Sequence, residues 1–222
     1  GLHVHAVQKL ARTYEHVDPA LVGNERVITI SDMSGQSNVL VKAEAMGLPL
    51  AKGSKEVQKI LTEVKRLESE GYEFEAAEAS FELLIRRMLG QETHCFELLE
   101  FHTTHRFRSG MTAETNEATV KLFVHGKAEY TVDEGDGPVN ALDKALRKAL
   151  LPHFPQIASM RLEDYKVRII DSGSGTAAKT RVLIVSTDGA RTWGTVGVST
   201  NIIDASWQAL VDSMEYFLLQ GR

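Results

Sequence analysis

Cysteine is nearly absent from this sequence, because Cys95 is the single cysteine among 222 residues. One cysteine cannot form an internal disulfide, which excludes a disulfide-stabilised secreted scaffold and favours a reducing compartment. Long apolar runs are absent too, since no stretch approaches the roughly 18–20 residues that a membrane-spanning helix requires. The first 15 residues carry polar and charged groups throughout, unlike a signal peptide. We therefore expect a cytoplasmic protein without a membrane partner.

The chain also lacks an excess of basic charge. Its 25 lysine and arginine residues are scattered, and 30 aspartate and glutamate residues bring the net charge to −5. This balance argues against nucleic acid as a partner. With 43% apolar and 25% charged residues, the composition is that of an ordinary globular protein of one or two domains.

An initiator methionine is lacking, since the sequence opens with Gly1-Leu2-His3. We interpret this start as a cut made inside a longer protein. The alternative is a stand-alone module, which would have a natural start codon immediately upstream.

Residues 1–52 mix short helices with β-rich sequence. We expect a helix over Ala6–Thr13, a turn at Asp18-Pro19, a β-rich run over Arg26–Ser31 and a second helix over Asn38–Ala45. Ser37 has the side chain of an N-cap for that second helix.

Residues 53–93 have helical periodicity. Ser54 is placed to cap a first helix, which Gly71 ends. A second helix is predicted over Phe74–Leu89, so two antiparallel helices joined by a tight glycine turn are expected.

Residues 94–222 change to the period of strands. Segments rich in β-branched residues predict strands over Glu97–Phe107, Glu117–Val124, Tyr165–Ile170, Arg181–Val185 and Thr192–Val198. Hairpin turns are indicated at 125–127 and 187–190. An amphipathic helix follows each set of strands, with apolar positions from Val139 to Leu150 in the first and from Ile203 to Leu218 in the second.

These two sets form an internal repeat. A constant offset of 64 residues aligns 130–142 with 194–206 and superimposes Ala141 on Ala205, and Leu146 on Leu210. Each repeat is three strands followed by a helix, and a single such unit cannot bury its apolar face. We therefore expect two βββα units to pack together and to be doubled in a dimer, with a ligand pocket at the seam between the units.

The glycine-rich run 173–180 departs from the phosphate-loop pattern, because Ala178 stands where glycine is required. A strand is predicted after this run, whereas a phosphate loop opens a helix. We interpret the run as a loop that links strands.

Histidine and cysteine residues give no metal pattern. His3 and His5 could share one strand face, but a helix is predicted after them and no carboxylate has a matching spacing, so we expect no metal site in this chain. His102 and His105 are expected at the surface or the core edge. Cys95 precedes a predicted strand and is expected to pack in the interior.

The turn Glu134–Asn140 has the composition of a candidate binding site. Its two glycines, Gly135 and Gly137, permit unusual φ angles, and Pro138 suits the first turn of a helix. Exposed N–H groups at such a turn can hold a carboxylate, while Asp136 could pair with an ammonium. The combination suits a free amino acid, but an ordinary helix start would have the same composition.

Two groups of motifs resemble a known family. The stretch that follows the catalytic barrel in citramalate synthases is similar to 13–19, 22–26 and 34–38. The regulatory domain of the same enzymes is similar to 164–168, 171–173 and 193–202. The wider family includes 2-isopropylmalate synthase and homocitrate synthase, and the resemblance is weakest over 54–91.

The resemblance implies an α+β fold from which the catalytic TIM barrel is absent. Residues 1–52 would form a post-barrel accessory subdomain and 53–93 a helical linker subdomain. Residues 94–222 would form a regulatory dimerisation domain of two βββα units, the LeuA-type allosteric dimerisation domain, in a homodimer.

The resemblance also implies a parent enzyme that condenses acetyl-CoA with a 2-oxo acid, pyruvate for citramalate. Its divalent metal would lie in the missing barrel, so this chain would hold no cofactor and be inactive alone. His3 matches the histidine of a Gly-x-His motif after the barrel, and Tyr14 matches a tyrosine before Asp-Pro. Both would act in the partner subunit's barrel as acid/base or positioning groups. At His3 the match is incomplete, because Val4-His5 follows where many relatives have Gln-Asp.

In the regulatory domain, the resemblance implies an effector site. The positions that match effector-contacting residues are Gly135, Asp136, Gly137, Pro138, Val139, Asp164 and Tyr165. Isoleucine would be the effector of a citramalate synthase and leucine that of a 2-isopropylmalate synthase. Between the two ends of the chain, the helical residues 54–91 would transmit the effector's signal.

Overall fold

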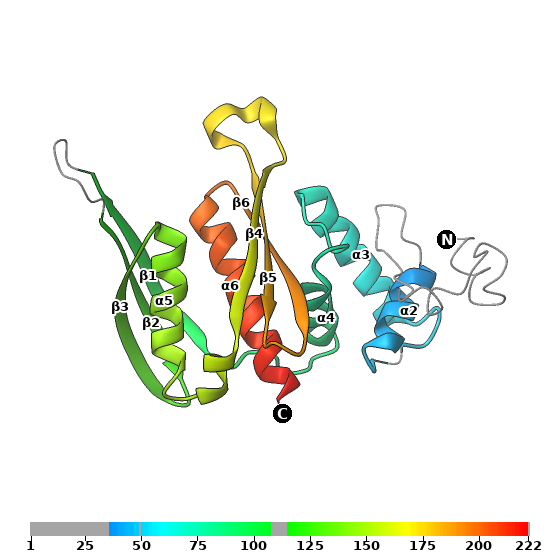
Figure 1. Cartoon of the computed structure of the whole chain (residues 1–222). Helices are drawn as coiled ribbons and strands as arrows, with labels where there is room; N and C mark the ends of the chain where they lie inside the picture. Colours follow the sequence, from blue (N-terminus) through cyan, green and yellow to red (C-terminus); the bar gives the residue numbers. More distant parts are fainter. Residues whose placement is uncertain (1–35, 49, 108–114, 222) are drawn as a thin grey trace, which may run out of the picture.

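The computed structural model describes residues 36–48, 50–107 and 115–221. The described residues form two three-stranded sheets, each followed in the chain by a helix that packs on it. Figure 1 shows the sheets side by side, with further helices beside the second sheet. Ala6–Thr13, Asp18-Pro19 and Arg26–Ser31 lie outside the described residues.

The first sheet is antiparallel, in the order β1 (Glu97–Arg106), β2 (Thr115–Val124), β3 (Lys127–Gly135). Helix α5 (Pro138–Leu150) follows it and packs on β2 and β3. A short 3-10 helix, η3 (Pro155–Ser159), leads into the second sheet.

The second sheet has the same order and direction of strands. It consists of β4 (Arg161–Ile169), β5 (Thr180–Thr187) and β6 (Thr192–Ser199). Helix α6 (Ile202–Gln220) follows and packs on β5 and β6. The glycine-rich run forms η4 (Ser172–Ala177) in the loop between β4 and β5, which extends beyond the sheet in Figure 1. Its prediction as a strand-linking loop is confirmed.

The repeat is confirmed in detail. The register of β1 and β2 shifts between Leu98 and Glu100, and that of β4 and β5 shifts between Leu162 and Asp164, which is the same place after 64 residues. The Thr131 hydroxyl donates to the Ala145 carbonyl at 2.7 Å, and the Thr195 hydroxyl donates to the Ala209 carbonyl at 2.8 Å. The two units therefore share local hydrogen bonds as well as topology.

One apolar core joins the two units. It contains the inward side chains of β2 and β5 together with one face of α5 and one face of α6. Phe101 of β1 stacks on Trp207 of α6 with ring centroids 4.9 Å apart, so the first sheet touches the second unit's helix directly. Burial of apolar area between the units is thus the main contribution that holds them together.

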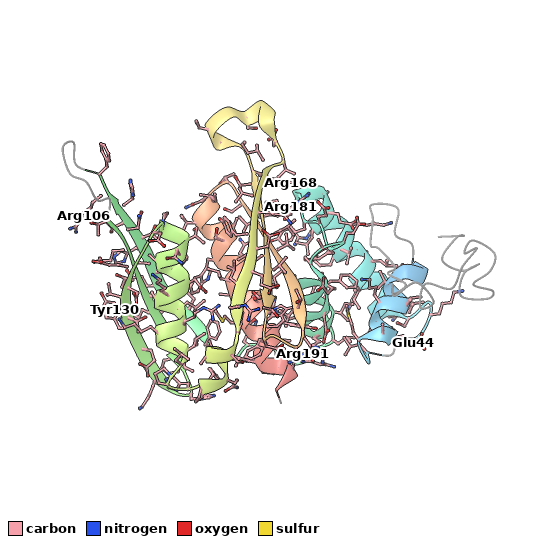
Figure 2. The ribbon with its side chains drawn as sticks, viewed as in Figure 1. Glu44, Arg106, Tyr130, Arg168, Arg181 and Arg191 are labelled. Carbon is pink, nitrogen blue, oxygen red and sulfur yellow. The ribbon has the colours of Figure 1, made fainter. Side chains whose placement is uncertain are left out.

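The outer faces of the two sheets differ. On the second sheet, Val196 and Val198 belong to a second apolar cluster with α2 (Gln36–Ala45), α3 (Lys55–Glu70) and α4 (Glu78–Met88). On the first sheet, the large side chains of Phe123, Tyr130 and Val132 are exposed; Figure 2 shows Tyr130 on the outer side.

Helix α3 begins and ends as predicted. The Ser54 hydroxyl accepts from the Val57 N–H at 3.3 Å. Gly71 has φ 110°, and the Tyr72 N–H donates to the Leu67 carbonyl at 3.0 Å, which is the pairing of a left-handed helix end.

Three details of the helical region differ from prediction. Helix α2 begins at Gln36, so Ser37 lies inside the helix and is not its N-cap. Helix α4 begins at Glu78 rather than Phe74, because Phe74 packs against Phe81 (ring centroids 5.6 Å apart) from a non-helical segment. The connection after Gly71 is accordingly longer than a tight turn, and α4 packs mainly on α6 and β6 rather than on α3.

Candidate functional site

A cavity of about 590 Å³ lies at the seam between the two units. One wall is the face of α5 that carries Val139, Asn140, Asp143, Arg147 and the adjoining Leu151, and the opposite walls come from η3 and the start of β4. We call it the seam cavity; its other lining residues are Ile157, Ala158, Met160, Arg161, Leu162 and Tyr165. The size is typical of a pocket for a small organic ligand.

Two of the seven predicted effector residues line this cavity. Val139 contributes from the first turn of α5 and Tyr165 from β4. The Tyr165 hydroxyl lies 2.8 Å from the Ser206 Oγ on α6, and burial raises the pKa of Tyr165. Gly135, Asp136, Gly137, Pro138 and Asp164 are not among its lining residues.

The turn before α5 is held by side-chain amides. The Asp136 N–H donates to the Asn140 Oδ1 at 3.2 Å, and the Asn116 Nδ2 donates to the Asp136 carbonyl at 3.3 Å. Gly137 is the N-cap residue and provides no side-chain cap, so the first N–H groups of α5 depend on other partners.

Gly135 and Gly137 permit unusual φ angles, but the structure does not use this freedom. Neither residue has a positive φ, and Gly137 is extended with φ −157°. Gly135 is needed for a different reason: a Cβ there would lie 2.4 Å from the Ala141 backbone nitrogen. The first glycine therefore permits close packing of the strand end against α5.

Asp164 pairs with a neighbour on its own strand. Its carboxylate lies 2.5 Å from the Lys166 Nζ, and the hydrogen bond from Lys166 lowers the pKa of Asp164. Both side chains are well exposed, and such pairs contribute little to stability.

The sequence did not single out the charged pair in the seam cavity. Asp143 and Arg147 are four residues apart on α5, with the Arg147 Nε 2.9 and 3.0 Å from the two carboxylate oxygens of Asp143. Arg147 also donates from Nη1 to the Met160 carbonyl at 2.7 Å, which fixes the end of η3 against α5. The i, i+4 spacing of opposite charges was the available signal, but on most helices it marks a solvated face.

A second cavity of about 360 Å³ lies between α3, α4 and α6. Its charged residues include Arg87, which donates from Nη2 to Asp212 at 2.9 Å and to Glu215 at 2.7 Å. The His94 Nδ1 lies 2.9 Å from Glu215, and the Ser80 hydroxyl donates to Asp212 at 2.7 Å. Burial raises the pKa of both Asp212 and Glu215.

Several other candidates are placed outside these cavities. His3 and Tyr14 lie outside the described residues. His102 and His105 are exposed, as expected, with the His105 Nδ1 2.8 Å from the Asn116 Oδ1. Cys95 is buried, as expected. Within the described parts of the chain, no group of three His, Cys, Asp or Glu side chains could hold a metal ion.

Family models match both ends of the chain. The model described as the LeuA allosteric (dimerisation) domain matches residues 75–218, and that described as homocitrate synthase post-HMGL domain-like matches residues 1–72. The first match covers more than half of the chain. The chain belongs to the LeuA allosteric (dimerisation) domain family. This LeuA domain includes both βββα units, the seam cavity and α4.

Curated relatives of the LeuA-family chain are enzymes. It is 50% identical over its whole length to an (R)-citramalate synthase of Aquifex aeolicus, of which it covers 42%. It is 49% identical over 98% of its length to the (R)-citramalate synthase of Geobacter sulfurreducens, and 43% identical over its whole length to that of Streptomyces coelicolor. It covers 41% of each, so the chain spans about two fifths of the length of these relatives.

Among the described residues, no helix is both long enough and apolar enough to cross a bilayer.

Proposed function

We propose that this chain is the C-terminal accessory and regulatory region of an (R)-citramalate synthase, and that it binds isoleucine for feedback inhibition. The observation that carries the proposal is a large, mainly apolar cavity at the seam of a LeuA allosteric domain. The identity of up to 50% with (R)-citramalate synthases supports the choice of parent enzyme.

The parent reaction in this proposal is the condensation of acetyl-CoA with pyruvate. That reaction needs a base, a cation that polarises the ketone and an acid for the new alkoxide. We assign the divalent metal to a barrel outside this chain, so that the chain alone is inactive and works in the cytoplasm as part of the larger enzyme. His3 and Tyr14 are proposed to assist catalysis in the partner subunit's barrel.

A homodimer is part of the proposal. The LeuA family is described as a dimerisation domain. Phe123 and Tyr130 leave apolar surface exposed on the first sheet, whereas the matching face of the second sheet is covered by α3 and α4. A second copy would bury the exposed surface.

Two alternatives are kept. In the first, the parent is a 2-isopropylmalate synthase and leucine is the effector. In the second, the chain is a stand-alone amino-acid-binding module. The first alternative is compatible with the cavity's aliphatic wall, which can accommodate leucine as well as isoleucine.

Isothermal titration of the 222-residue chain with isoleucine, leucine and valine tests the proposal. We expect saturable binding with isoleucine preferred by about 10-fold or more, since one misplaced methyl group costs about 1–3 kcal/mol in a fitted apolar pocket. D-Isoleucine is the matched control and should bind weakly. Preference for leucine would favour the alternative parent, and absence of binding by all three would overturn the sensing function.

A further inference from the structure

The seam cavity combines apolar walls with a small set of polar groups. Its apolar side chains include Leu151, Ile157, Met160 and Leu162, and its charged groups deep in the wall are Asp143 and Arg147. The side chains of these two residues are only 16% and 18% exposed. A ligand for such a cavity needs an aliphatic part and groups that satisfy both charges.

Asp143 and Arg147 each keep hydrogen-bonding sites that their mutual ion pair does not use. Arg147 has five N–H donors and uses Nε and Nη1 on described groups, which leaves Nη2 without a partner among the described residues. The Asp143 carboxylate accepts from Arg147 alone in that part of the chain, although it has about four lone-pair sites.

Asn140 adds a further donor on the same side of α5. Its Oδ1 accepts from the Asp136 N–H, which orients the amide, and its Nδ2 has no partner among the described residues. The α5 wall of the seam cavity thus offers one carboxylate and two donor groups, from three positions on one helix. Arg161 and Tyr165 add polar groups from β4.

The repeat shows that the βββα fold does not require these charges. The 64-residue offset places Trp207 at the position of Asp143 and Val211 at the position of Arg147. Both equivalents on α6 are uncharged, yet α6 packs on its sheet in the same way as α5. Burial of an ion pair costs desolvation energy, and an apolar pair of similar volume is often at least as stable. Arg147 also fixes η3 through the Met160 carbonyl, but Asp143 contacts only Arg147 among the described residues, so the pair calls for a role beyond the packing of α5 on its sheet.

We infer that Asp143 and Arg147 recognise the two charged ends of a zwitterionic α-amino acid in the seam cavity. Asp143 accepts from the ammonium group, whereas Arg147 Nη2 and Asn140 Nδ2 donate to the carboxylate. The aliphatic side chain then lies against Ile157, Met160 and Leu162. This inference rests on the proposed function. It adds the residues that bind the ammonium and the carboxylate of the effector.

Binding of isoleucine and of two one-ended analogues tests the inference. The analogues are 3-methylpentanoic acid, which lacks the ammonium, and 2-methylbutylamine, which lacks the carboxylate. NMR titrations of the 222-residue chain would compare the unaltered protein with Asp143→Asn and Arg147→Gln.

Asp143→Asn is expected to weaken isoleucine on the order of 10- to 100-fold and to leave 3-methylpentanoic acid unchanged, because that acid has no group for Asp143. Arg147→Gln is expected to weaken isoleucine by a similar factor and to leave 2-methylbutylamine unchanged. Asp188→Asn and Arg191→Gln are matched controls, since this ion pair lies on the turn between β5 and β6 and neither residue lines the seam cavity. Neither control should change binding.

Because Arg147 also holds the Met160 carbonyl, Arg147→Gln could fail to fold. Arg147→Lys then replaces it: the lysine keeps the charge but loses the planar fork, so isoleucine binding should weaken while 2-methylbutylamine binding persists. Equal loss of all ligands in the folded variants, or binding that matches the unaltered protein, would overturn this inference alone. Absence of isoleucine binding by the unaltered protein would overturn the proposed function.

Discussion

The two glycines of the turn before α5 have different structural roles. Gly135 packs so closely on α5 that a Cβ would lie 2.4 Å from the Ala141 nitrogen and 2.9 Å from its Cα. Gly137 has open space around the position of a Cβ and an extended backbone that any residue can adopt. A sequence motif that contains both glycines does not reveal this difference.

Gly135→Ala is therefore expected to lower the free energy of unfolding by about 1–3 kcal/mol, the usual cost of overpacking. Gly137→Ala is the control in the same turn and should change it by less than about 0.5 kcal/mol. Urea unfolding followed by circular dichroism measures both values. Similar losses for the two variants would show that the close contact at Gly135 has no energetic role.

At the scale of elements, α6 connects the seam cavity with the junction of the two family-model regions. The Ser206 hydroxyl of α6 forms a hydrogen bond with the Tyr165 hydroxyl in the cavity wall. Gln208 of the same helix accepts from the Tyr72 hydroxyl at 2.9 Å and from the Val198 N–H at 3.0 Å, and Tyr72 is the last residue of the first matched region. A displacement of Tyr165 by a ligand would thus act directly on the helix that holds the junction.

The junction is also tied to the second sheet. Arg181 of β5, which Figure 2 labels near the end of α3, donates from Nε to the Gly71 carbonyl at 2.5 Å and pairs with Glu73. A Cβ on Gly71 would lie 2.2 Å from the terminal Cδ1 of Ile170, a contact that this side chain can relieve by moving, so the positive φ is the main reason for glycine here. The end of α3 is therefore fixed to the LeuA domain at several points.

The buried carboxylates of α6 give a prediction about pH. Because burial raises the pKa of Asp212 and of Glu215, the folded protein binds their protons more tightly than the unfolded chain. The free energy of unfolding must then fall as pH rises from the ordinary carboxyl range through these raised pKa values. Arg87, His94 and Ser80 face this pair and reduce the effect without reversing it.

Asp212→Asn cannot titrate, so its stability relative to the unaltered protein should improve as pH rises from about 4 to about 8. Asp188→Asn is a control for which the stability difference from the unaltered protein should change with pH in the opposite direction. Hydrogen bonds from the N–H groups of Arg191 and Ala190 lower the pKa of Asp188 to about 2, so its contribution to stability is lost as pH falls from the ordinary aspartate range towards this lowered pKa. Urea unfolding at a series of pH values gives both slopes. If the free energies of unfolding of Asp212→Asn and the unaltered protein changed with pH in parallel, the raised pKa of Asp212 would be contradicted.

At the scale of the whole molecule, the repeat made most of the regulatory fold predictable. Strand and helix periods, together with the 64-residue offset, indicated both βββα units and a pocket at their seam. The repeat could not indicate α4's place on α6 and β6, since that packing depends on contacts between Ser80 or Arg87 and residues more than 120 positions away.

The lining of the candidate site was predictable only in part, for a similar reason. Val139 and Tyr165 were found through motifs, but Asp143 and Arg147 became candidates only when η3 and β4 closed the cavity over α5. Burial distinguishes this pair from an ordinary exposed i, i+4 pair, and burial is not visible in a helix read alone.

The most direct test of the account is to locate bound isoleucine by isotope-filtered NOE spectroscopy. The central claim predicts NOEs from the methyl groups of isoleucine to the side chains of Ile157, Met160 and Leu162, which line the seam cavity. NOEs to Leu67, Leu84 and Val211 would instead place the ligand in the cavity between α3, α4 and α6 and would contradict the claim.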